Sequence, residues 1–278
     1  MSQDFEQATR VEGKNGVYSA FVSPAWEIWG PNGGYMASIA MRAAACEAQV
    51  RSPASFYCQF LRVARFDAIE ARVTVVQSGR RSESIRVSLV QEGKPVAEGL
   101  LRTALPGEGL EHTAYRTPEV PAPESLPRFD DLRRPDMRKF TFWDNVEGRV
   151  IHPERFDPDR GPLPPRWLEW YRFRPIARFD DPFLDACRSL VLIDTLGWPA
   201  ARLAHTAPRF RAPNLDVVAF FHAPIGHSEW LLCDEEAPIG RGGLIASTAR
   251  IFDCDGALVA SGGAQLLCVP PPPGWATG

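Results

Sequence analysis

The feature that most constrains the fold of this chain is an internal repeat. Residues 255–262 read DGALVASG and align with EGKPVAEG at residues 92–99, which is an offset of 163 positions. Three further matches keep the same offset: Tyr57 with Phe220, Gly79 with Gly242, and Ser84 with Ser247. The alternative is a chance similarity over eight residues. The shared order and spacing favour a duplication, so the chain is predicted to contain two copies of one folding unit.

Each copy reads as one helix followed by strands. In the first half Met36, Ile39 and Ala43 lie on one face of a predicted helix at residues 36–47. The second helix is predicted at residues 183–198. Alternating apolar runs predict strands at 55–61, 69–77, 84–91 and 95–103, and again at 215–222, 229–233, 243–252 and 257–269. The fold class is therefore α+β, with each helix packed on a mostly antiparallel sheet.

The repeat divides the chain into an N-terminal unit at 1–104, a crossover segment at 105–165 and a C-terminal unit at 166–278. Half of the 26 prolines lie between residues 104 and 182, so much of this stretch is predicted to be irregular. It is too aromatic for a disordered linker, because Phe140, Trp143 and Trp167 fall within it. Residues 167–173 are predicted to add a strand to the second sheet.

Composition excludes several classes of function. A formal net charge of -3 over 278 residues argues against a nucleic acid or an anionic membrane as a partner. No apolar run approaches the roughly 18 residues of a membrane span, and no leader segment is visible, so a cytoplasmic location is expected. The six cysteines have no Cys-x-x-Cys spacing. They are predicted to be buried thiols, with no metal site and no cofactor.

Paired glycines mark the start of the first helix. In the run WGPNGGY, Gly33 and Gly34 precede the helical segment, and a helix start exposes backbone N–H groups at the positive end of the helix dipole. Without side chains, Gly33 and Gly34 allow a carbonyl or an oxyanion to approach these donors closely. Asn32 is a further candidate donor. A simple turn before a helix is the plainer interpretation.

Asp194 is the most informative acid, because it lies on the apolar face of the second helix. It stands four residues after Leu190 and seven after Cys187. A carboxylate that faces a core is destabilising unless it is hydrogen-bonded or functional, so Asp194 is a candidate general base or nucleophile. Capping of a neighbouring backbone group near the helix end is the alternative.

The repeat relates these two features. The first half offers backbone donors without an acid, and the second offers an acid without a glycine pair. In a pseudo-twofold arrangement, the start of one helix approaches the other helix. We therefore predict one composite site built from Gly33, Gly34 and Asp194.

Several motifs, in this order along the chain, resemble the double-hotdog acyl-CoA thioesterases related to type II acyl-CoA thioesterase. They are GPNGGY at 30–35, LDVVAFFHAP at 215–224, EWLL at 229–232, and DCDG through VAS to Gln265 at 253–265. The resemblance implies a double hotdog, in which a curved sheet wraps a central helix in each half. It also implies hydrolysis of acyl-CoA to a free acid and coenzyme A without a metal, and a homo-oligomer that is a dimer of double hotdogs.

In that family a helix Asp, a Thr or Ser at the next strand and a Gln on the last strand orient the attacking water. Asp194 matches the first of these. The hydroxyl position falls at Asn214, and the glutamine position falls at Ala264, with Gln265 one place later. A shift of one residue turns Gln265 to the other face of the sheet unless a bulge at 262–263 absorbs it. The predicted catalytic residues are Asp194, Asn214 and Gln265.

Two other functions compete with thioester hydrolysis. A hotdog enoyl-CoA hydratase needs an Asp and His pair, and no histidine follows closely after Asp194 or lies near Asn32. A non-catalytic acyl-CoA binding protein is the second, and it is favoured by the two departures from the family pattern at Asn214 and Gln265.

Overall fold

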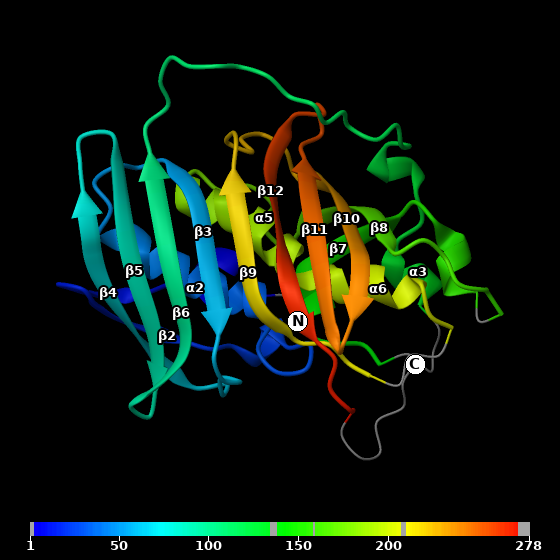
Figure 1. Ribbon diagram of the computed structural model, residues 1–278, viewed down its shortest axis with the longest axis horizontal. Coiled ribbons are helices and arrows are strands. Elements are labelled where there is room, and N and C mark those ends of the chain that lie inside the picture. The colour runs from blue at the N-terminus through cyan, green and yellow to red at the C-terminus, as the bar shows by residue number, and fades with distance from the viewer. Residues whose placement is uncertain (1–2, 134–137, 158, 207–209, 272–278) are drawn as a thin grey trace.

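One continuous antiparallel sheet of twelve strands organises the fold of this computed structural model, which describes residues 3–133, 138–157, 159–206 and 210–271 (Figure 1). The strand order is β1-β2-β4-β5-β6-β3-β9-β12-β11-β10-β8-β7. The strands are β1 Glu12–Lys14, β2 Val17–Phe21, β3 Pro53–Phe60, β4 Ala68–Ser78, β5 Ser82–Gln91, β6 Lys94–Ala104, β7 Val146–Val150, β8 Arg166–Phe173, β9 Asn214–Phe221, β10 Trp230–Arg241, β11 Leu244–Phe252 and β12 Leu258–Leu267.

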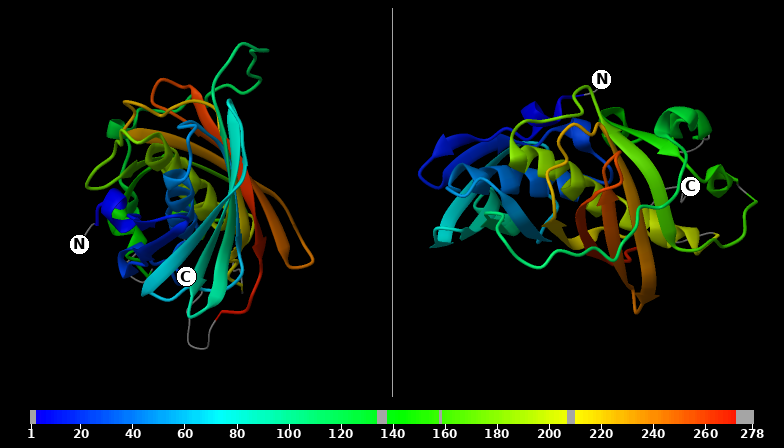
Figure 2. Two further views of the ribbon diagram at one scale, coloured as in Figure 1. Left: turned by 90° about the vertical axis from the view of Figure 1, so that its left-hand side faces the viewer. Right: turned by 90° about the horizontal axis from the view of Figure 1, so that it is seen from above.

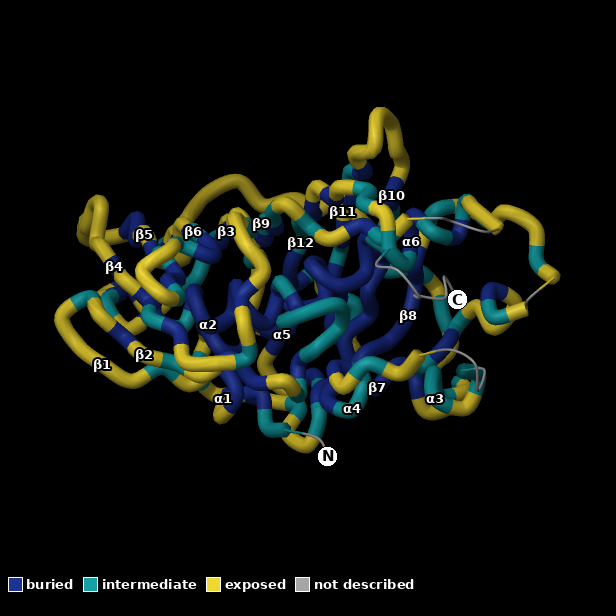
Figure 3. Tube along the Cα trace, turned by 90° about the horizontal axis from the view of Figure 1, so that it is seen from below, coloured by how far each residue is buried: buried dark blue, intermediate teal, exposed yellow. Residues whose placement is uncertain are grey.

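The helices lie on one face of this sheet, with two long ones at the centre. These are α2 Gly33–Cys46 and α5 Pro182–Thr195, and α6 Gly197–Leu203 follows α5 directly. Shorter α-helices are α1 Phe5–Ala8, α3 Phe129–Leu132 and α4 Phe142–Asn145, and 3-10 turns are η1 Pro24–Trp26, η2 Pro123–Ser125 and η3 Pro153–Phe156. The sheet twists across the two central helices (Figure 2). Both helices are buried along most of their length (Figure 3).

The duplication is visible in the sheet order, because each half contributes the same strand pattern read from opposite ends. The halves meet where β3 pairs with β9, and there Phe56 lies opposite Ala219, the residue 163 positions further along the chain. A residue that pairs with its own counterpart marks the pseudo-twofold axis. The predicted fold class, an α+β double hotdog of two tandem units, is confirmed.

Small residues allow the central helices to approach closely. The alanines of α2 at positions 37, 40, 43, 44 and 45 are all 5% exposed or less. At Gly34 the contact becomes backbone against backbone, since a Cβ there would stand 2.6 Å from Val191 Cα on α5. Any side chain at Gly34 would therefore push the two helices apart.

The structure differs from expectation at three places after the first unit. The predicted helix at 183–198 ends at Thr195, and a separate helix begins at Gly197, because Pro199 lacks the N–H that a continuous helix needs. The strand predicted at 229–233 extends to Arg241. The prediction stopped short because the acidic residues 234–236 interrupt the apolar pattern, although they belong to the strand. The crossover segment also contains an edge strand, β7.

The predicted strand at 167–173 is confirmed as β8, which pairs with β10. The domain boundaries at 104 and 165 stay a prediction.

Replacing Gly34 by Ala tests the close helix crossing. A new methyl group against the Val191 backbone is expected to lower the free energy of unfolding by about 1–3 kcal/mol. Urea denaturation monitored by circular dichroism measures the loss. Gly109→Ala is the matched control, because a Cβ at Gly109 meets no atom within 4 Å. Equal stability of the two variants would contradict a backbone contact at Gly34.

Candidate active site

The candidate site forms where the last turn of α5 meets the first turn of α2. Asp194 belongs to the last turn of α5 and is 6% exposed, because the apolar run before it directs this face of the helix inward. Its carboxylate Oδ2 accepts a hydrogen bond from the Gly34 N–H at 2.6 Å. The glycine half and the acid half of the predicted site therefore touch directly.

Two asparagines complete the contacts of the carboxylate. Asn214, the first residue of β9, donates from Nδ2 to Asp194 Oδ1 at 2.7 Å and to the Asp194 carbonyl oxygen at 2.6 Å. Asn32 donates from Nδ2 to Asp194 Oδ2 at 3.3 Å and to Thr195 Oγ1 at 3.1 Å. The same Asn32 caps α2, because its Oδ1 accepts from the Tyr35 N–H at 2.8 Å. The helix cap and the acid are thus held by one side chain.

Gly33 leaves a donor open next to the acid. The N–H groups of Gly34 and Tyr35 are bound to Asp194 and Asn32, whereas no described protein group accepts from the Gly33 N–H. A Cβ on Gly33 would stand 2.6 Å from Asp194 Oδ1, so only glycine fits between the helix start and the carboxylate. Gly33 and Asp194 both line the main cavity.

Burial raises the pKa of Asp194 to about 6, against hydrogen bonds from Asn214, the Gly34 N–H and Asn32 that lower it. The desolvation effect is the largest of these causes. The carboxylate is therefore ionised near neutral pH but holds a proton more readily than an exposed aspartate. That balance suits a group that must accept and return a proton.

The cavity beside Asp194 has a volume of about 950 Å³. Of the described residues, nine aromatic side chains line it: Trp29, Phe60, Phe129, Phe140, Trp143, Phe156, Trp167, Trp198 and Phe210. Seven described arginines do so as well: Arg62, Arg133, Arg138, Arg155, Arg160, Arg202 and Arg211. The proline-rich crossover supplies many of both kinds, so this segment forms a wall of the cavity.

Sequence reasoning did not predict this wall. The aromatic content of the crossover was the available signal, and it indicated an ordered segment without showing what the segment faces. Arg155 illustrates the difficulty, because its guanidinium is buried against Glu169 and lies 3.9 Å from the Trp167 ring centroid. Both of these contacts, Glu169 and Trp167, belong to β8. No motif in the sequence of β8 indicates that it borders a pocket.

The structure does not bring Gln265 to this site. The register of β12 with both β9 and β11 is regular through Gly262 and Gly263. The irregularity against β9 comes after Gln265, between Gln265 and Leu266, so it does not turn Gln265 inward. Ala264 faces inward and is 8% exposed, while the Gln265 side chain is exposed on the opposite face. Its backbone N–H donates to Asp216 Oδ1 at 3.0 Å. The assignment of Gln265 to the catalytic set is therefore corrected.

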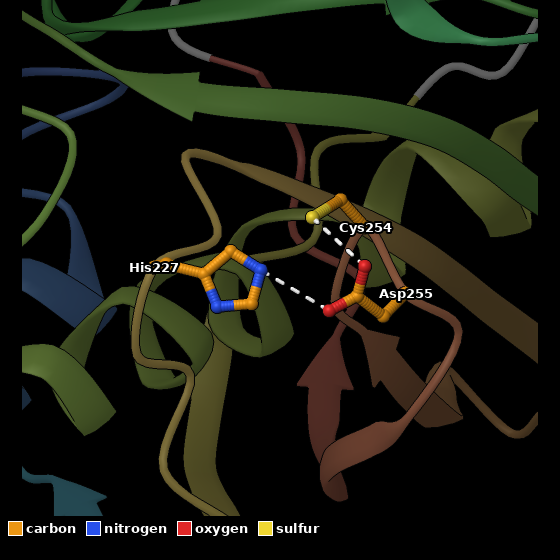
Figure 4. Close-up of side chains that lie close together, drawn as sticks. All are labelled: His227, Cys254 and Asp255. Atoms are coloured by element: carbon orange, nitrogen blue, oxygen red, sulfur yellow. Dashed lines mark hydrogen bonds and ion pairs between the residues drawn. The ribbon is translucent and has the colours of Figure 1, made fainter.

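One group of potential metal ligands occurs among the described residues, at His227, Cys254 and Asp255 (Figure 4). All three are exposed. His227 Nε2 lies 3.1 Å from Asp255 Oδ2, which is the geometry of a surface ion pair. We interpret this group as a contact between two loops.

A twelve-stranded antiparallel sheet over two central helices, with a composite acid site between the helices, defines a tandem hotdog protein. The acyl-CoA thioesterase N-terminal domain matches residues 22–104, and the acyl-CoA thioesterase C-terminal domain matches residues 118–269. The second match alone covers more than half of the chain. The chain therefore belongs to this family of acyl-CoA thioesterases, as the sequence resemblance predicted.

Solved structures share the fold at low identity. A hotdog protein of unknown function from Alicyclobacillus acidocaldarius is 20% identical, with a TM-score of 0.84 over 98% of this chain and 100% of that chain. Acyl-CoA thioesterase II TesB2 from Mycobacterium marinum is 23% identical, with a TM-score of 0.78 over 97% and 99%. The dehydratase domain of PpsC from Mycobacterium tuberculosis is 12% identical, with a TM-score of 0.51 over 91% and 93%. Proteins named for two different reactions, as a thioesterase and as a dehydratase, therefore share this fold.

In the described part of the chain, no helix combines the length and the apolar character needed to cross a membrane.

The Asn214 contact predicts a change in the titration of Asp194. Asn214→Ala removes the donor to Oδ1, so the charged form is less stabilised and the pKa should rise by about one unit. Carbon-13 NMR of labelled aspartate carboxyl groups measures this pKa. Gln265→Ala is the control and should leave it unchanged, since Gln265 is exposed on the other face of the sheet. An equal shift in both variants would contradict the assignment.

Proposed function

We propose that this protein hydrolyses an acyl-CoA to a free acid and coenzyme A. One observation carries the proposal: a buried carboxylate at Asp194, with a raised pKa, lies against the open Gly33 N–H at the wall of a large cavity. A base beside a backbone donor is the arrangement that addition of water to a carbonyl requires. Asp194, Asn214, Asn32, Gly33 and Gly34 form the proposed site.

In the proposed mechanism Asp194 takes a proton from a water molecule as the water oxygen forms a bond to the thioester carbon. The carbonyl oxygen becomes an oxyanion and accepts a hydrogen bond from the Gly33 N–H. When the intermediate collapses, the carbon–sulfur bond breaks, and the proton on Asp194 passes to the leaving thiolate. Gly34, Asn32 and Asn214 hold the carboxylate in place throughout.

Direct attack by Asp194 is the second variant, and it would form a mixed anhydride that water then hydrolyses. Both variants use the same residues. The contacts favour the general base, because each carboxylate oxygen already accepts at least one hydrogen bond that restrains it. An oxygen that must form a covalent bond would have to leave such a donor.

The cavity wall supports an acyl-CoA substrate. Among the lining arginines, Arg155 is paired with Glu169 and Arg138 with Glu27. Arg62 and Arg160 donate to backbone carbonyl oxygens, so their positive charges are available to the phosphates of coenzyme A. Aromatic side chains provide apolar surface for the acyl group. An assembly of two double-hotdog chains belongs to this proposal through the family resemblance, and a cytoplasmic location belongs to it through the sequence expectation given above.

The hydratase alternative lacks its second catalytic group. Among the described residues that line the cavity there is no histidine to act with Asp194 as an acid–base pair. A binding protein without turnover remains the other candidate, and substrate assays separate the three.

Asp194→Asn tests the base directly. Hydrolysis, measured with a thiol reagent over a panel of acyl-CoA substrates, should fall by about 10²–10⁴-fold, because the amide cannot accept the proton. Asp180→Asn is the control, since Asp180 is exposed. Unchanged rates in Asp194→Asn would remove Asp194 from the mechanism. Tight binding without hydrolysis in the unaltered protein would favour the binding role, and hydration of crotonyl-CoA would favour the hydratase.

The pH dependence follows from the same group. Asp194 must be ionised to accept a proton, so kcat/KM should rise with pH and reach half of its plateau near pH 6. Measuring kcat/KM for one good substrate from about pH 4.5 to about pH 8.5 gives the pH profile. This is roughly the range in which a folded domain is expected to stay stable. A rate that stays flat down to pH 5 would show that this carboxylate is not the base.

A further inference from the structure

A second carboxyl group lies buried on the sheet beneath Asp194, outside the cavity lining. Glu235 of β10 is 1% exposed, and Asp194 is close enough for its charge to act on Glu235. Ser247 of β11, 5% exposed, faces the same side. A Cβ on Gly197 would stand 2.8 Å from Ser247 Oγ and 3.1 Å from Glu235 Oε1. Both polar groups therefore lie against the first residue of α6, three positions after Asp194.

The position of this pair in the sheet is informative. Ser247 pairs in register with Ala264 of β12, and its hydroxyl lies 3.5 Å from the Ala264 carbonyl oxygen. Ala264 occupies the place where the family resemblance expects a glutamine that faces the acid. In this chain the position holds Ala264. A hydroxyl lies on the next strand at Ser247, and a carboxyl lies on the strand after that at Glu235, which pairs with Ala249, two residues from Ser247.

Glu235 has little support as an ion. Neither of its oxygens makes a well-formed hydrogen bond with a described protein group, although the Ser247 hydroxyl is near enough to lower its pKa somewhat. Burial, followed by the like charge of Asp194, raises the pKa of Glu235 well above its usual range. Asp234, the next residue in β10, is held on the opposite face of the strand by Arg166 and Arg250. Burial without a well-formed hydrogen bond from a described protein group therefore favours the protonated form of Glu235.

A neutral carboxylic acid offers one O–H donor and one free acceptor, the same pair of functions as a glutamine amide. A buried polar group without a direct partner is ordinarily satisfied by an ordered water. We propose that Glu235 is a positioning residue, which together with Ser247 holds a water against Asp194 and supplies the polar support that Ala264 cannot give. This inference rests on the proposed function only for its effect on rate.

The decisive comparison is Glu235→Gln with Glu235→Leu. Gln keeps a donor and an acceptor in similar volume, so kcat and the pKa of Asp194 should stay within about twofold and a few tenths of a unit of the unaltered protein. Leu removes both functions, so kcat should fall about tenfold with KM unchanged, and the pKa of Asp194 should rise by about one unit. Ser247→Ala is a smaller change and should likewise lower kcat and raise the pKa of Asp194. It provides the test if Glu235→Leu does not fold.

Carbon-13 NMR titration of Asp194 gives a readout that needs no substrate, so this inference can fail or succeed independently of the thioesterase proposal. Glu236→Gln is the matched control, because Glu236 is half-buried on the other face beside Arg250. A fall in the pKa of Asp194 in Glu235→Gln would mean that Glu235 is ionised, which overturns the proposal. An unchanged pKa of Asp194 in both Glu235→Leu and Ser247→Ala would overturn it as well.

Discussion

The structure depends on one contact, the crossing of α2 and α5 at Gly34 and Val191. At this point the two helices meet without an intervening side chain, and the Gly34 N–H reaches the carboxylate of Asp194 one turn further along α5. The helix dipole of α2 and the buried charge of Asp194 stabilise each other there. Packing of the core and assembly of the site are consequently the same event, since neither helix can shift without separating the donor from the acid.

The starts of the two central helices differ, and this difference is consistent with a single proposed site. Asp181 caps this helix by accepting from the N–H groups of Phe183 and Leu184, and Pro182 has no N–H to offer. Nearby, Arg188 and Asp185 form a buried ion pair that fills the space beside the helix. The start of α5 is thus closed by its own residues, whereas at the start of α2 Gly33 lines the cavity and no described protein group accepts from its N–H.

Sequence reasoning reached the fold and the centre of the site because both depend on local patterns. The repeat at an offset of 163 indicates two copies of one unit with a helix followed by strands, and Gly33, Gly34 and Asp194 stand out for their position on a helix. Asn214 followed from the family pattern. What could not be predicted depends on contacts between distant segments. The register of β10 and β12 decides that Glu235 faces inward and that no bulge turns Gln265 inward, because a shift of one residue reverses the face. The crossover residues that line the cavity lie in short helices and loops, whose packing no local pattern indicates.

The pairing of Phe56 with Ala219 at the pseudo-twofold axis has a consequence for how such a chain can diverge. Two identical subunits joined at that strand would each have to carry the glycine pair and the acid, and every substitution would appear twice. A covalent fusion removes this restriction, because β3 and β9 belong to one polypeptide and each half can change alone. Gene fusion therefore allows the two sides of a symmetric interface to differ, so that one half supplies the glycine pair and the other supplies Asp194.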